Sequence, residues 1–339
     1  MSIHRNRMLG LSLIELMIAM VLGLLIMAGV ASIFSANSQI NRSSQNVSRV
    51  QETARTVFEL MGRDLRESGV NGCGRISNDS VHNVLTGAGT AALWWANWTG
   101  GIIGYEAGTV LAGIPIGAGV GGRVATSDVV HSMHGSPSVF QVVTHNTAAA
   151  PPVINLGGPD LNTMQNGDIA MVCDFLMASI FQVTNNRSGT GNGLAHATGG
   201  GFAPGNASVG LGGSGLTYAY PPNANVMRLE SSTWYVGNND RPDSGGLSLF
   251  RAVSRNGGGT STAPVAEEVA EGITDLQVQY LLNGAYVTAA AVAANAWQNV
   301  TAVRIQLTLQ GLEQERDAAG ALTRVTRQFT QVIALRNRL

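Results

Sequence analysis

Residues 10–34 read GLSLIELMIAMVLGLLIMAGVASIF, and this stretch decides the architecture of the whole chain. After the glycine the side chains are apolar or small, with a single charge at Glu15. As an α-helix they extend about 36 Å, which is enough to cross the hydrocarbon core of a bilayer. Arg5 and Arg7 precede the run and no basic residue follows it closely, so we expect a cytoplasmic N-terminus with the rest of the chain translocated.

A cleavable secretory signal peptide and a plain membrane anchor are alternative interpretations of this run. Residues 29–31, GVA, could serve as a small-x-small cleavage site, but the apolar run is longer than the core of a signal peptide. A carboxylate deep in a membrane helix costs about 2.5–3.5 kcal/mol, so Glu15 is expected to have a partner and a purpose. The simpler alternative is an interfacial Glu15 that reaches the lipid headgroups.

Residues 10–15, GLSLIE, resemble the class III signal of type IV prepilins and pseudopilins. The resemblance implies that a prepilin peptidase cuts between Gly10 and Leu11 and then methylates the new amine of Leu11. It also implies that Glu15, as the fifth mature residue, docks the subunit by pairing with such an amine on a neighbour. The family usually has phenylalanine at the position of Leu11.

The helical pattern continues beyond the apolar run, without a proline before Ser68-Gly69, which is typical of a helix end. Its apolar residues form a single stripe, and polar residues such as Glu52, Arg55 and Asp64 fill the other positions. The stripe consists of Ile40, Val47, Val50, Ala54, Val57, Phe58, Met61 and Leu65. We expect a helix of about 85 Å with a membrane half at residues 11–34 and an amphipathic half at residues 35–68. A coiled coil is the alternative, but the heptads are too few.

The remaining residues, 69–339, alternate like β-strands, with glycine-rich stretches that predict long loops. Expected strands are residues 127–133, 139–144, a hairpin over 168–184, and three C-terminal strands at 276–280, 303–310 and 326–335. Together with the resemblance, the sequence predicts an α+β, pilin-like fold. In it, a leader peptide (residues 1–10) precedes a long helix packed on an antiparallel sheet domain.

Several phrases of the domain look like the PilW family of type IV pilus minor pilins. They are NGD at 166–168, CD at 173–174, FQVT at 181–184, WYVGN at 234–238, LFR at 249–251, EGI at 271–273 and ALRNR at 334–338. The EGI phrase also occurs in type II secretion pseudopilins, so it does not separate the two systems.

Cys73 and Cys173 both follow the expected membrane helix. In an oxidising periplasm they would form one disulfide, which closes a loop of 100 residues and stabilises the fold by about 4.7 kcal/mol on a chain-entropy model. Two buried free thiols are the alternative.

Composition excludes several classes of function. All 20 cationic residues are arginine, so no lysine is present for a Schiff base, a phosphate loop or a Ser-Lys dyad. The net charge is −1, and removal of the leader leaves 18 cations against 21 anions. We therefore expect no nucleic-acid partner.

Three motif-like groups indicate loops and packing. The glycines of residues 117–122 match G-x-G-x-x-G, but strand-like residues follow in place of a helix. On a strand, the spacing of Asp128, His131 and His134 puts the two histidines on opposite faces, which disfavours a metal site. An acidic turn has too few carboxylates for calcium: Asn238, Asn239, Asp240 and Asp243. We expect no catalytic residue, cofactor or metal.

Trp94, Trp95 and Trp98, with Tyr105 nearby, are the best candidates for contact with a partner or a glycan. Packing beneath long loops, or contact between pilins, is the more ordinary role of such a cluster.

The resemblance implies a minor pilin in the inner membrane, and later at the pilus tip, rather than an enzyme. Its expected partners are other minor pilins, the major pilin, the prepilin peptidase, the assembly platform and a tip adhesin. The alternatives are a type II secretion minor pseudopilin and a membrane-anchored carbohydrate-binding protein.

Overall fold

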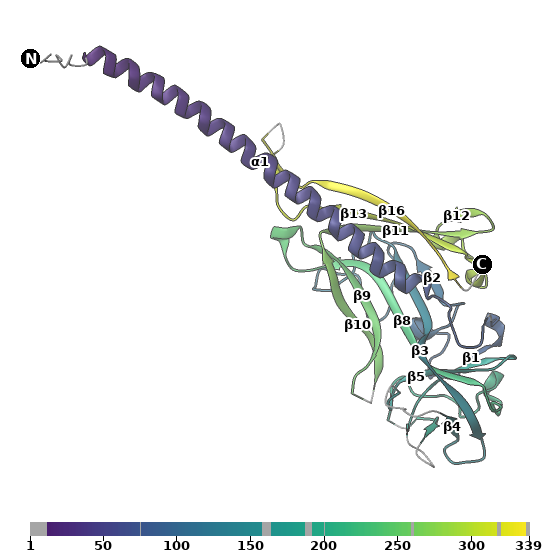
Figure 1. The fold of residues 1–339 in the computed structure, drawn as a ribbon. Coiled ribbons are helices and arrows are strands. Elements are labelled where there is room, and N and C mark those ends of the chain that lie inside the picture. The colour runs from purple at the N-terminus through teal and green to yellow at the C-terminus, as the bar shows by residue number, and fades with distance from the viewer. Residues whose placement is uncertain are drawn as a thin grey trace, which may run out of the picture.

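A long helix projects from a β-rich head in the computed structural model (Figure 1). The structure describes residues 12–74, 76–157, 164–186, 192–199, 201–258, 261–316 and 320–336. The helix, α1, spans Leu13–Arg66 without a break, and Glu67 caps its C-terminus. The expected continuous helix is confirmed, and its end lies within two residues of the expected stop at Ser68-Gly69.

A ten-stranded sheet forms most of the head, in the order β1-β6-β5-β8-β3-β4-β7, with β9 beside β8, β10 beside β9 and β2 beside β3. Neighbouring strands are antiparallel except for β1 and β6. The strands are β1 (Val81–Asn83), β2 (Ile102–Tyr105), β3 (Val129–Asn146), β4 (Val153–Gly157), β5 (Ile169–Cys173), β6 (Ala178–Gln182), β7 (Gly193–Ala195), β8 (Asn225–Asn238), β9 (Leu247–Asn256) and β10 (Thr262–Glu271).

A second, four-stranded antiparallel sheet has the order β12-β11-β13-β16, and a two-stranded ribbon joins β14 to β15. These strands are β11 (Ile273–Leu282), β12 (Ala285–Val287), β13 (Ala302–Gln310), β14 (Glu315–Arg316), β15 (Leu322–Thr323) and β16 (Thr326–Ala334). β11, β13 and β16 are the three expected C-terminal strands, and they pack against α1 (Figure 1).

Short 3₁₀ turns are the other helical segments among the described residues: η1 (Asn78–Ser80), η2 (Ala91–Ala96), η4 (Gly213–Gly215), η5 (Pro242–Ser244), η6 (Ala289–Ala291) and η7 (Trp297–Asn299).

One strand expectation needs correction. Residues 129–133 and 139–144 belong to a single strand, β3, which is 18 residues long, and residues 127 and 128 precede it. Its register with β8 shifts between Gly135 and Val139, where Pro137 has no N–H to donate to a ladder. The break in the apolar alternation therefore marks a bulge within one strand. The expected hairpin is confirmed as β5 and β6.

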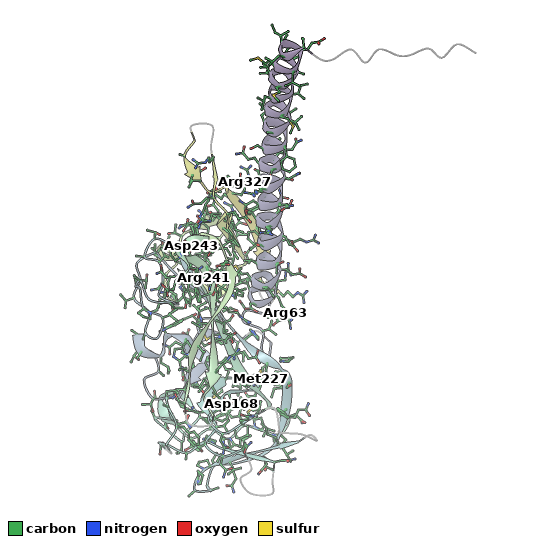
Figure 2. The ribbon with its side chains drawn as sticks, turned by 90° about the vertical axis from the view of Figure 1, so that its left-hand side faces the viewer. Arg63, Asp168, Met227, Arg241, Asp243 and Arg327 are labelled. Atoms are coloured by element: carbon green, nitrogen blue, oxygen red, sulfur yellow. A yellow bond between two sulfur atoms is a disulfide. The ribbon has the colours of Figure 1, made fainter. Side chains whose placement is uncertain are left out.

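The contact between α1 and the head begins later than the apolar stripe suggested. Ile40 is 64% exposed, and burial along α1 starts at Asn46, whose side chain donates to the carbonyl of Glu313. From Val50 to Leu65 the stripe joins one core with the small sheet. The stripe thus packs over about four turns and leaves the rest of α1 projecting (Figure 2).

A glycine in the large sheet allows a tyrosine of the small sheet to pack closely against it. A Cβ on Gly104 in β2 would lie 2.1 Å from the hydroxyl oxygen of Tyr280 in β11, so only glycine admits this ring. Tyr280 is fully buried and makes an edge contact with Trp297.

Candidate functional site

The first turn of α1 carries a reciprocal cap. The backbone N–H of Glu15 donates to the hydroxyl of Ser12 at 3.2 Å, and the carboxylate Oε2 of Glu15 accepts from the backbone N–H of Ser12 at 3.2 Å. This capping box satisfies two helix-end donors that would otherwise lack partners. The Ser-x-x-Glu spacing in the sequence is the signal of such a box, which is a role for Glu15 beside the expected docking and interfacial roles.

Gly10 and Leu11, the expected cleavage and methylation positions, lie outside the described residues. The apolar half of α1 does lie within them. Its 18-residue window has a mean hydropathy of 2.6 and none of it is buried. A helix this apolar and unburied is long enough to span a membrane. It belongs in a bilayer or against other helices.

The C-terminal end of α1 is fixed to the head by a buried carboxylate. Asp64 is one of the polar residues outside the apolar stripe of α1, and only 8% of it is exposed. Its Oδ2 accepts from the indole Nε1–H of Trp234 at 3.0 Å and lies 2.8 Å from Nε of Arg251. Nη2 of Arg251 also donates to Oδ1 at 3.1 Å.

The surroundings of Asp64 act on its pKa in opposite directions. Burial raises the pKa of this carboxyl above its ordinary value, although the charge of Arg251 and the hydrogen bond from Trp234 oppose the shift. The Arg251 guanidinium also lies 5.6 Å from the centre of the Trp234 ring. We call Asp64, Trp234 and Arg251 the stem latch.

Further contacts extend the latch along the end of the helix. The hydroxyls of Ser68 and Ser132 lie 2.6 Å apart, and Ser132 donates to the carbonyl of Asp64 at 3.1 Å. The N–H of Gly69 donates to the carbonyl of Met133 at 2.8 Å. Because these bonds join α1 and the segment after it to β3 and β8, the stem and the large sheet form one unit.

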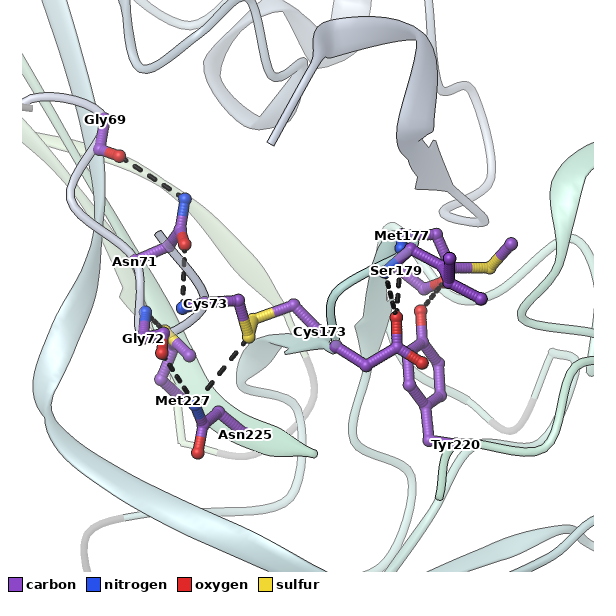
Figure 3. The surroundings of a disulfide bond; sticks show 12 residues. Gly69, Asn71, Gly72, Cys73, Cys173, Met177, Ser179, Tyr220, Asn225 and Met227 are labelled. Carbon is purple, nitrogen blue, oxygen red and sulfur yellow. Dashed lines mark hydrogen bonds between the residues drawn. A yellow bond between two sulfur atoms is a disulfide. The ribbon is translucent and has the colours of Figure 1, made fainter. Parts of the chain in front are cut away.

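The two cysteines form the expected disulfide, with Cα atoms 6.0 Å apart. Figure 3 shows that the bridge ties the segment after α1 to the end of β5. Asn71 accepts from the N–H of Cys73 at 2.9 Å, and Asn225 of β8 donates to the carbonyl of Gly72 at 2.6 Å. The bridge therefore holds the chain just beyond the stem latch.

The tryptophan cluster lies in a core rather than on a surface. Trp94 and Trp95 are 5% and 6% exposed, and Trp98 is half-buried against the same core. The indole of Trp94 donates to the carbonyl of Ala112 at 2.9 Å and makes an edge contact with His131. Stacking on a sugar needs an open ring face. Buried rings favour the packing role.

The candidate metal ligands are engaged in packing. Asp128 accepts from the backbone N–H groups of Ala107 and Val278, at 3.0 Å each. His131 is completely buried at 2.8 Å from the hydroxyl of Thr233, and burial lowers its pKa to about 3. Among the described residues, no group of three or more His, Cys, Asp or Glu side chains could hold a metal ion.

The glycine motif and the acidic turn are joined by hydrogen bonds. Residues 117–122 form a loop that returns to Arg123, and no helix follows it. The side-chain amide of Asn238 donates to the carbonyls of Gly117 and Gly122, and that of Asn239 donates to the Ser248 hydroxyl. These side chains close a loop, which is a structural role.

Two protein-family models match the chain, one at the start of α1 and one in the C-terminal part of the head. Residues 5–31 match the prokaryotic N-terminal methylation motif, and residues 233–337 match the PilW family, type IV pilus-assembly protein W. The resemblance to the PilW family is confirmed. The PilW match contains Trp234, Arg251 and the small sheet, which are the parts that bind α1.

The two matches support a type IV pilus-related pilin with a prepilin signal. They point to a structural component of the pilus rather than to an enzyme. No curated protein and no solved structure matches the chain. Residues 32–232, which include the disulfide and the tryptophan cluster, lie outside both matched segments.

Proposed function

We propose that the chain is a minor pilin of the type IV pilus that co-assembles with other minor pilins and primes the filament at its tip. One observation carries the proposal: a prepilin motif opens a single 54-residue helix whose apolar half is entirely unburied. Such a helix is stable in the inner membrane and, after extraction, only against the apolar stems of other subunits.

In this proposal the prepilin peptidase cuts between Gly10 and Leu11 and methylates Leu11. Residues 11–34 then hold the subunit in the inner membrane, with the N-terminus cytoplasmic and the head periplasmic. The amphipathic half, residues 35–68, carries the head, residues 69–339.

The capping box is compatible with a docking role for Glu15. Both contacts to Ser12 use Oε2, so Oε1 is free of hydrogen bonds to the described residues. In low dielectric an unpaired carboxylate is costly, and the methylated amine of a neighbouring subunit would neutralise it. Ser12 thus aims the carboxylate while Oε1 accepts from the neighbour.

The proposed partners are other minor pilins and the major pilin through the stem, the inner-membrane assembly platform, and a tip adhesin. A type II secretion minor pseudopilin has the same stem and signal, and co-purification separates the two. Recovery of pilus subunits supports the proposal, and recovery of secretion pseudopilins would replace it.

The test is the mass of the mature N-terminus, measured on the full chain from cells with and without prepilin peptidase. We expect a chain that begins at methylated Leu11 only when the peptidase is present, and an uncut chain for Gly10→Val. Gly29→Val is the matched control, since it changes a glycine in the same helix away from the cut. An uncut wild-type chain, or one that begins near Ser32, would refute the pilin function.

A further inference from the structure

The turn between β5 and β6 exposes two large apolar side chains side by side in the sequence. Phe175 is fully exposed and Leu176 is 71% exposed, whereas Cys173 and Ala178 at the ends of the turn are completely buried. Burial of large apolar side chains is favourable, so an adjacent exposed pair is a candidate contact surface.

The turn is held rigid by Asp174. One carboxylate oxygen, Oδ1, accepts from the backbone N–H groups of Leu176 at 2.8 Å and Met177 at 3.0 Å. The N–H of Asp174 in turn donates to the carbonyl of Met177 at 3.0 Å. These bonds fix the backbone of the turn on which Phe175 and Leu176 stand.

A second layer of contacts holds Asp174 in place. Its Oδ2 accepts from the hydroxyl of Tyr218 at 2.6 Å, and burial together with this acceptor raises the pKa of Tyr218 to about 12, so the phenol keeps its proton. The preceding residue, Cys173, is bridged to Cys73 (Figure 3). Ala178, after the turn, pairs with Val81 of β1. The turn is therefore preorganised, which lowers the entropic cost of binding.

The position of the turn excludes the membrane around α1 as its binding partner. β5 lies in the part of the head beyond the C-terminal end of α1, as do the labelled Met227 and Asp168 (Figures 1 and 2). The helix from residue 34 to residue 66 alone spans about 48 Å, so an anchored subunit carries the turn far from its own bilayer. Contact with that lipid surface is out of reach.

The charge around the turn favours a protein partner over an anionic lipid. The described residues of 76–98, 164–186 and 205–225 include three carboxylates and no arginine. Arg228 of β8 pairs with Ala170 of β5, and its guanidinium forms an ion pair with Glu230. Anionic headgroups attract basic clusters, and a single paired arginine does not form one. A nonpolar pocket on a protein matches both the apolar tip and the lack of a basic cluster.

The geometry points to a docking turn, in which Phe175 and Leu176 insert as paired anchors into an apolar pocket of another pilin-class subunit. This inference rests on the proposed pilin function. Rigid aromatic and aliphatic anchors of this kind dominate the energy of protein interfaces.

The experiment places a photoreactive benzoylphenylalanine at position 175 of the full chain, in cells that assemble pili, and identifies the crosslinked partner by mass spectrometry. The matched control carries the same group at Val110, which is 81% exposed elsewhere on the head. We expect a discrete crosslink from position 175 to a chain with a processed prepilin N-terminus, and none from position 110.

A second measurement uses the double substitution Phe175→Ser and Leu176→Ser, with Val110→Ser as control. Co-purification of the crosslinked partner should fall about 30-fold for the double variant, the loss that corresponds to about 2 kcal/mol at a hot spot, and stay unchanged for the control. Unchanged co-purification, or a crosslink only to lipid, would overturn the inference.

The N-terminal mass of the same samples separates the two proposals. Cleavage at Leu11 without a crosslink from position 175 refutes the docking turn and leaves the pilin function intact. An uncut chain refutes the pilin function, and the docking turn with it.

Discussion

Replacing Asp64 with alanine tests whether the stem latch fixes the helix to the head. The substitution leaves the indole N–H of Trp234, which is 1% exposed, without its acceptor. An unsatisfied buried donor costs about 1–3 kcal/mol. The side chain of Arg251 is 34% exposed and can return to water, so the loss of its ion pair adds only about 1 kcal/mol. We expect Asp64→Ala to lower the free energy of unfolding by about 2–4 kcal/mol at pH 7.

Asparagine at the same position separates the hydrogen bond from the charge. Asp64→Asn keeps an oxygen that accepts from Trp234, and it removes a carboxylate whose ionisation is opposed by burial. Because the folded-state pKa is raised, folded Asp64 binds a proton more readily than unfolded Asp64. Its contribution to stability is therefore greatest below the ordinary pKa and is lost as the pH rises through the raised value. Asp64→Asn should cost less than about 1 kcal/mol and remove this part of the pH dependence.

The assay is chemical denaturation of the full chain in detergent micelles, followed by tryptophan fluorescence. Glu59→Ala is the matched control, because Glu59 is an exposed carboxylate on the same helix. It should change stability by less than about 0.5 kcal/mol. An Asp64→Ala variant as stable as Glu59→Ala, or one no less stable than Asp64→Asn, would refute the role assigned to the latch.

Three further predictions concern other parts of the chain. Replacing Cys73 and Cys173 together with serine should lower the free energy of unfolding by up to about 4.7 kcal/mol, and a reducing agent should lower the Tm of the wild type but not of this variant. Ser12→Ala should cost about 0.5–2 kcal/mol at the first turn of α1, seen as faster hydrogen exchange there and unchanged exchange in the head. Burial lowers the pKa of His145 to about 4 and of His196 to about 3, so the free energy of unfolding should fall as the pH drops below about 6.5. Glutamine at both positions should weaken this dependence of stability on pH. An unaltered dependence would contradict the role given to the two histidines.

The parts of the fold that the sequence predicted are those with a regular period. The stem repeats its apolar residues every three or four positions, and apolar and polar side chains alternate along residues 276–280 of β11 and 303–310 of β13. Such a pattern arises within one helix or strand that buries one face, so it can be read from the local sequence. β3 was read as two strands because Pro137 interrupts its alternation, and only the pairing with β8 shows that the chain continues in the same direction.

The stem latch could not be predicted in this way. Asp64 occupies a helix position where a polar residue is ordinary, and its partner Trp234 lies 170 residues away. Nothing in the local pattern distinguishes a solvated aspartate from one that accepts a buried indole. The capping box is different, since the spacing of Ser12 and Glu15 is a local signal that sequence reading can use directly.

The tryptophans and the docking turn show why exposure, rather than residue type, identifies the surfaces left for partners. Three tryptophans within five positions suggested a binding site, yet the head folds over Trp94 and Trp95. Phe175 and Leu176 gave no signal in the sequence, because one aromatic residue beside a hairpin turn is unremarkable. After the cores are filled, large exposed apolar side chains are concentrated along residues 13–34, with an adjacent pair at positions 175 and 176 on a turn fixed by side-chain hydrogen bonds. The first is the membrane and stem surface, and the second is therefore the strongest remaining candidate for contact between subunits.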